Sequence, residues 1–92
     1  MKLTKKNIGD LVLIKWRDHS SCAKWREKSN ILKDETLYEA TIGIYHGNSE
    51  YENVVYSTYE LGSETVGQVF WILRTDIVYV KVILRSKEVA KL

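Results

Sequence analysis

The sequence contains no proline and only one cysteine, and both scarcities narrow the class of protein. Without proline, the chain has none of the stiff polyproline linkers that separate domains. Its one thiol, Cys22, cannot form a disulfide within the chain, which favours a reducing compartment. The N-terminal residues lack the apolar stretch of a signal peptide, and the longest apolar run, 69–73, is far shorter than the about 20 residues of a membrane span. We therefore expect a cytoplasmic protein that does not enter a membrane.

Basic residues are missing from the middle of the chain. Residues 1–33 contain nine Lys or Arg and three acidic residues, whereas residues 34–73 contain seven acidic residues and no Lys or Arg. Residues 74–92 contain five basic and two acidic residues, so the net charge of +2 conceals blocks of +6, −7 and +3. This distribution predicts one cationic and one anionic surface, and each surface selects the molecules that dock on it.

Length and composition indicate one folded domain that spans residues 1–92. The hydrophobic fraction of 45% and the charged fraction of 28% are those of an ordinary soluble globular protein. We expect a folded unit over about residues 8–84, preceded by a basic N-terminal arm, 1–7, and followed by a C-terminal tail, 85–92. The tail is short enough to form one helical turn or to fray.

Apolar residues recur with a period of two in most of the chain, which predicts strands. The expected strands cover residues 11–16, 38–45, 50–59, 66–73 and 77–84. Turn residues at 46–49 and 61–63, and a short connection at 74–76, separate the later strands. Gly43 interrupts the second strand and predicts a bulge or a sharp bend. Residues 17–33 follow neither period and predict a long loop with one helical turn near 23–28. Five short strands with one long loop describe a small, strongly bent barrel.

Several short motifs resemble those of SH3-like barrels. They are Ile8-Gly-Asp10 before the first strand, 15–20 at its end, Trp25 in the long loop, Gly43, and Ile72-Leu73-Arg74 before the last strand. The pattern is similar to that of small uncharacterised SH3-like proteins encoded by phages and other mobile elements. The resemblance implies a mainly β, five-stranded SH3-like barrel with a long first loop, a binding or regulatory role and no catalytic residues. An ALYDY-like stretch is missing, so the resemblance does not imply proline-rich ligands.

Two groups of residues could in principle carry chemistry. Residues 18–22, Asp-His-Ser-Ser-Cys, bring an acid, an imidazole, hydroxyls and a thiol together, but catalytic triads are assembled from separated elements. The polar side chains of this segment are more typical of a loop that hydrogen-bonds its own backbone. His19, Cys22 and His46 fall short of the four ligands, in two close pairs, of a usual zinc site. We therefore expect a protein that is not an enzyme and that holds no cofactor and no metal.

A near-repeat places an indole between cations twice, in Lys15-Trp-Arg-Asp18 and Lys24-Trp-Arg-Glu27. Single-stranded nucleic acid binds to such arrangements, because bases stack on aromatic rings while cations contact phosphates. Trp16 shares a strand face with Val12 and Ile14 and is expected in the core. Trp25 either contacts a ligand or closes one end of the barrel. The candidate basic site consists of Lys15, Arg17, Lys24, Trp25, Arg26 and Lys28.

The acidic block contains a second candidate site, in which carboxylates alternate with tyrosines. Such a surface either receives a basic protein or forms a solvated outer face of the sheet. Its residues are Tyr45, Glu50, Tyr51, Glu52 and Tyr59.

Two functions use these opposite surfaces. The first is a non-enzymatic protein-interaction or regulatory module that binds an unidentified protein, and the second is a barrel that binds single-stranded nucleic acid. A pI of 8.7 and a net charge of +2 are modest for a nucleic-acid-binding domain, so we place protein interaction first. The apolar last strand, 77–84, would also pair with a copy of itself if it lies at an edge of the sheet. The chain is therefore expected as a monomer or a weak homodimer.

Overall fold

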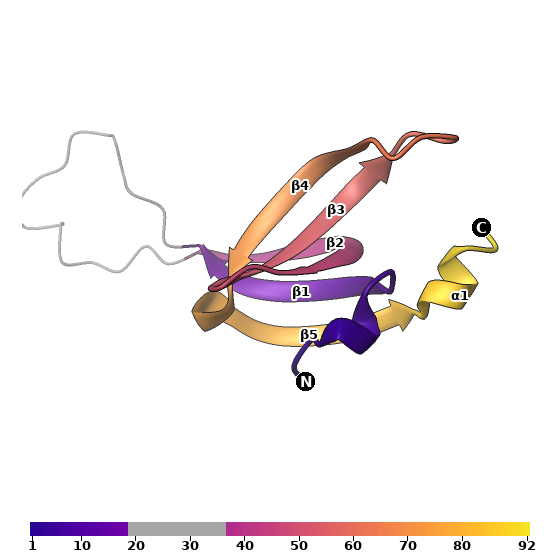
Figure 1. The fold of residues 1–92 in the computed structure, drawn as a ribbon. Helices are drawn as coiled ribbons and strands as arrows, with labels where there is room; N and C mark the ends of the chain where they lie inside the picture. The colour runs from indigo at the N-terminus through magenta and orange to yellow at the C-terminus, as the bar shows by residue number, and fades with distance from the viewer. Residues whose placement is uncertain (19–36) are drawn as a thin grey trace, which may run out of the picture.

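The computed structural model describes residues 1–18 and 37–92, which form five strands and three short helices (Figure 1). The elements are η1 (Lys5–Asn7), β1 (Leu11–Asp18), β2 (Leu37–Asn48), β3 (Glu52–Tyr59), β4 (Val66–Leu73), η3 (Arg74–Asp76), β5 (Ile77–Leu84) and α1 (Ser86–Val89). All five predicted strands are confirmed, and the tail forms one helical turn. None of the helices in these two ranges has the length and apolar character needed to cross a bilayer.

The strands form one antiparallel sheet in the order β4-β3-β2-β1-β5. β2 belongs to both halves of this sheet, because residues 37–44 pair with β1 and residues 44–48 pair with β3. The sheet bends along β2, so β3 and β4 rise away from β1 and β5 (Figure 1). The mainly β, five-stranded architecture is confirmed. β4 and β5 do not pair within the described residues, so closure of the sheet into a barrel stays a prediction.

Gly43 lets the backbones of β2 and β3 approach closely at this bend. A Cβ atom at Gly43 would lie 2.8 Å from the carbonyl oxygen of Tyr56, closer than carbon and oxygen atoms pack. The register of β2 against β1 runs through Gly43 without a shift, and the irregularity against β3 falls between Tyr45 and Gly47 instead. Of the two predicted alternatives, the bulge lies a few residues after Gly43, whereas Gly43 itself marks a close backbone contact where the sheet bends.

The chain reverses between β2 and β3 slightly later than the turn residues 46–49 predict. β2 continues to Asn48, with Gly47 at φ 139°, and the turn occupies residues 49–51. The Ser49 N–H donates to the Glu52 carbonyl at 2.9 Å, and the Glu52 N–H donates to Ser49 Oγ at 3.2 Å. Glycine extends the strand here because it tolerates positive φ within the irregular pairing.

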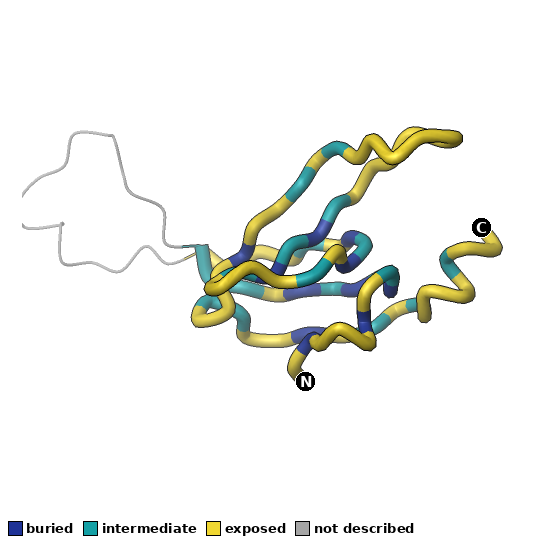
Figure 2. The backbone as a smooth tube through the Cα atoms, in the orientation of Figure 1, coloured by how far each residue is buried: buried dark blue, intermediate teal, exposed yellow. Residues whose placement is uncertain are grey.

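The core lies on one face of the sheet and includes a residue of the N-terminal arm. Its fully or almost fully buried side chains are Leu3, Val12, Ile14, Tyr45, Val55, Ile72 and Val80 (Figure 2). Trp16 packs against this cluster and donates its indole N–H to Thr41 Oγ1 at 2.9 Å, so its predicted core position is confirmed. Removing this apolar surface from water is the main force that holds the sheet together.

A buried carboxylate ties both ends of the chain to the start of β1. Asp10 is 1% exposed; its Oδ1 accepts the Ser86 backbone N–H at 2.7 Å, and its Oδ2 accepts Asn7 Nδ2 at 3.1 Å. Arg85 Nη1 lies 3.4 Å from the same Oδ2. Asp10 therefore fixes η1 and the beginning of α1 in one hydrogen-bonded cluster, which a charged acceptor makes stronger than neutral bonds would.

Candidate functional site

Most of the predicted basic site lies outside the described residues. Lys24, Trp25, Arg26 and Lys28 belong to this part of the chain, as do His19 and Cys22. The described members contact neighbouring elements: Lys15 Nζ lies 5.4 Å from the centre of the Tyr79 ring, and Arg17 Nη2 donates to the Thr75 carbonyl at 3.3 Å. Lys15 and Arg17 share one face of β1 and both reach toward the β5 side of the sheet.

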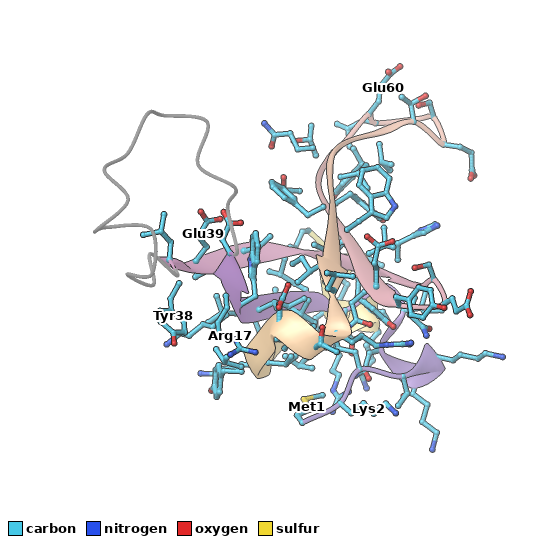
Figure 3. The ribbon with its side chains drawn as sticks, turned by 90° about the vertical axis from the view of Figure 1, so that its left-hand side faces the viewer. Met1, Lys2, Arg17, Tyr38, Glu39 and Glu60 are labelled. Atoms are coloured by element: carbon cyan, nitrogen blue, oxygen red, sulfur yellow. The ribbon has the colours of Figure 1, made fainter. Side chains whose placement is uncertain are left out.

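The opposite face of the same strand pair is acidic near its end. Glu39 pairs with Trp16 in register, and its carboxyl lies beside that of Asp18. Local desolvation, together with the charge of Asp18 and a hydrogen bond to it, raises the pKa of Glu39. Figure 3 shows Glu39 on one side of the ribbon and Arg17 and Tyr38 on the other. The end of the β1–β2 pair therefore separates charges of opposite sign onto its two faces.

Tyr45 is wrong as a member of the acidic tyrosine surface, because its side chain is fully buried in the core. Pairing with β1 places Thr41, Gly43 and Tyr45 on the core face of β2, while Ile42 is 54% exposed on the other. Burial raises the pKa of the Tyr45 phenol, and the charge of Arg74 partly opposes this. The hydroxyl has no hydrogen-bond partner among the described residues. It stays neutral inside the molecule and is not available to a partner.

The remaining members of this candidate surface are divided between the two ends of β3. Glu50, Tyr51 and Glu52 gather at the β2–β3 turn, where the Arg74 backbone N–H donates to the Tyr51 carbonyl at 2.9 Å. The Arg74 guanidinium also donates to the Glu50 carbonyl. Tyr59 ends the strand, roughly 23 Å from Glu52 at the usual rise per residue. The structure therefore brings Glu50, Tyr51 and Glu52 together. Tyr59 lies at the other end of β3, and Tyr45 lies in the core.

The most exposed apolar strand of the described structure is β4, which the sequence did not single out as a site. Val66, Phe70, Trp71 and Leu73 are each between 41% and 61% exposed. Phe70 pairs with Val55 and Trp71 with Val54, so the two aromatic side chains lie on opposite faces of the sheet. None of the eight residues of β4 is charged. A partner that lies along this strand would meet apolar side chains on both faces.

β4 also occupies an edge of the sheet formed by the described residues. Edge strands are usually short or carry a lysine or a proline, which disfavours pairing with other chains. The other edge strand, β5, contains Lys81, whereas β4 contains neither lysine nor proline. The one irregularity of β4 is Gln68 at φ 51°, whose Oε1 accepts Ser57 Oγ at 2.9 Å and Thr58 Oγ1 at 3.1 Å. The edge therefore has a local kink but no charge.

The charges closest to β4 lie near its two ends, and one of them, Glu52, pairs with Leu73 in the neighbouring strand. The β3–β4 hairpin, residues 52–73, contains Glu52, Glu60 and Glu64 and no Lys or Arg. Arg74 follows β4 directly. A ligand along β4 therefore finds an uncharged strand flanked by carboxylates, with one guanidinium at the end of the strand.

A shallow groove lies between β3 and α1, away from the open edge of β4. Its volume is about 410 Å³, and Ile44, Tyr56, Tyr59, Leu61, Val89 and Leu92 supply its apolar lining. The ring of His46 lies edge-on to Tyr56, with 6.2 Å between ring centres. In the parts of the chain that the structure describes, no three His, Cys, Asp or Glu residues lie close enough to hold a metal ion.

No protein-family profile, curated protein or solved structure matches this chain. The geometry of the described residues is therefore the basis on which a function is assigned. The exposed, uncharged edge at β4 is the feature of that geometry with the clearest consequence for binding.

Proposed function

We propose that this chain is a non-enzymatic protein-interaction module that receives an extended segment of another protein along β4. The observation that carries the proposal is the edge position of β4 combined with its exposed, uncharged side chains. In strand addition, the backbone N–H and C=O groups of an edge pair with the incoming segment, and side-chain contacts on alternate faces give specificity. β4 offers both kinds of contact.

The two aromatic residues are the expected anchors of such an interface. Phe70 and Trp71 are large, exposed and adjacent, and aromatic side chains are enriched among the residues that dominate binding energy. Leu73 and Val66 extend the apolar surface to both ends of the strand. The carboxylates beyond these ends favour an apolar partner segment with basic residues beside it.

Protein binding fits the described residues better than nucleic-acid binding does. The carboxylates of Glu60 and Glu64 near the exposed strand would repel phosphates, and residues 24–28, which the nucleic-acid hypothesis needs, lie outside the described part. A barrel that binds single-stranded nucleic acid through Lys15, Arg17 and this loop stays a prediction. We also propose a cytoplasmic location, a regulatory role and a likeness to SH3-like proteins of mobile elements.

Photo-crosslinking tests the proposed function at the site itself. A photo-reactive phenylalanine analogue replaces Trp71 in one variant and Tyr79 in a matched control, because both residues are exposed aromatics on opposite edges of the sheet. We expect irradiation in an extract of the source cells to attach a protein to position 71 and little or none to position 79. An adduct between two copies of the chain counts as a protein adduct.

Two results would contradict this function. Equal labelling at both positions would mean that β4 is not a selective surface. Attachment of nucleic acid in place of protein at position 71 would favour the alternative function.

A further inference from the structure

We propose that the segment received by β4 is the β4 strand of a second copy of this chain, paired antiparallel around a two-fold axis at Val69. This inference rests on the proposed function and names its partner. β4 combines an edge position with exposed apolar side chains on both faces. Two copies of such a strand satisfy each other's backbone groups and cover each other's apolar surface.

The symmetry of two identical antiparallel strands restricts their register. Side chains that oppose each other across a strand pair lie on the same face of the sheet. A two-fold axis perpendicular to the sheet keeps each residue on its own face. If the axis passed between two neighbouring residues, side chains on opposite faces would lie opposite each other. The axis must therefore pass through a residue, which then lies opposite its own copy. Only registers centred on a residue are therefore allowed, and near the middle of β4 these centre on Gln68, Val69 or Phe70.

The charges at the ends of β4 distinguish these three registers. With Val69 at the axis, the register continued just beyond the strand ends places Glu64 opposite Arg74 of the second copy, and the same pair recurs on the other side of the axis. With Phe70 at the axis, Glu64 lies opposite Asp76, which places like charges together. With Gln68 at the axis, Glu64 lies opposite Ile72 and Arg74 opposite Gly62. Charge complementarity therefore selects the register centred on Val69.

Both members of this ion pair are exposed. The Arg74 side chain lies against the β2–β3 turn in the single chain, so the pairing requires it to turn toward the open edge of β4. Glu64 lies in the β3–β4 loop and Arg74 directly after β4. The guanidinium of Arg74 donates to the Glu50 carbonyl through Nη2, and the five N–H donors of a guanidinium allow a further bond to a carboxylate. Two such pairs would frame the uncharged strands at either end.

The kink at Gln68 limits the strength of this pairing. In the register centred on Val69, Gln68 lies opposite Phe70 of the second copy, so both kinks fall beside the axis. Its side-chain amide stays on Ser57 and Thr58 of its own hairpin. A strand pair of this length, interrupted near its centre, predicts a dimer that dissociates on dilution rather than an obligate one.

Sedimentation equilibrium of charge-reversed variants tests the partner and the register together. The wild-type chain should dimerise reversibly, and Glu64→Arg or Arg74→Glu alone should each weaken dimerisation by about tenfold, because two ion pairs become two repulsions. An equimolar mixture of the two variants should recover the wild-type affinity, since both contacts across the axis again join opposite charges. Glu60→Arg, at the far tip of the hairpin (Figure 3), is the matched control and should leave the affinity unchanged.

The outcomes separate this inference from the proposed function. A chain that stays monomeric at all concentrations, while position 71 still crosslinks to another protein, overturns the second copy as partner and leaves the function intact. A dimer that is indifferent to both charge reversals, or that the mixture does not restore, overturns the register. Phe70→Lys, which introduces an edge lysine, should abolish dimerisation with an unchanged circular dichroism spectrum, and a persisting dimer would exclude β4 as the interface.

Discussion

Replacing Asp10 with alanine is expected to lower the free energy of unfolding by about 3 kcal/mol, because hydrogen bonds to a buried charged group are worth more than neutral ones. The carboxylate accepts the Ser86 N–H and Asn7 Nδ2 in a site that is 1% exposed. Its removal leaves these donors without their acceptor and releases η1 and α1 from the start of β1. Urea denaturation followed by tryptophan fluorescence measures the loss.

Arg85→Ala is the matched control for Asp10→Ala. The Arg85 side chain is 61% exposed, and exposed ion pairs contribute about 1 kcal/mol or less, so this variant should be only slightly destabilised. The comparison separates the hydrogen bonds of Asp10 from its ion pair. Equal losses in the two variants would mean that the ion pair, and not the bond to the Ser86 backbone, attaches the C-terminal turn.

Gly43→Ala is expected to destabilise the fold by about 2 kcal/mol, within the range for overpacked cores. The new methyl group would lie 2.8 Å from the Tyr56 carbonyl oxygen and 3.3 Å from Val55 Cβ. Relief requires a shift of the β3 backbone, which Val55 holds in the core. Thermal and urea unfolding curves give the difference from the wild-type chain.

Gly67→Ala provides the comparison at a second strand glycine. A Cβ there would meet only Thr58 Cβ, at 3.9 Å, which is an ordinary contact. Since alanine restricts the unfolded chain more than glycine does, this variant should be unchanged or more stable by about 0.5 kcal/mol. If Gly43→Ala were as well tolerated as Gly67→Ala, β2 and β3 would not approach each other as the structure shows.

The strands were predictable because the alternation of apolar and polar residues along the sequence matches the alternation of buried and exposed positions in the sheet. Val12, Ile14 and Trp16 alternate with more polar or exposed residues, and all three pack on the core side of β1. The connection at 74–76 and the helical turn of the tail were also recognisable from short-range signals. At Gly43 the sequence left a bulge and a sharp bend open, because a glycine within a strand occurs both at irregular pairing and at close backbone contacts.

The candidate site was less predictable, because it depends on which strands are neighbours. Tyr45 alternates with Ile44, and periodicity alone does not decide which of these two residues faces the core. Glu52 and Tyr59 belong to one strand, but its length separates them. β4 reads as an ordinary apolar strand, and only the strand order reveals that it lies at an edge with Phe70 and Trp71 exposed.

Amide hydrogen exchange of β4 over a dilution series tests most directly whether β4 is an open edge on which another strand docks. β1 serves as the internal reference, because it pairs on both sides within the chain. We expect the amides of β4 that point away from β3 to exchange rapidly in dilute protein and to become protected as the concentration rises, while β1 stays protected throughout. Protection of these β4 amides equal to that of β1 at every concentration would mean that β4 is already paired within its own chain and has no open edge for a partner.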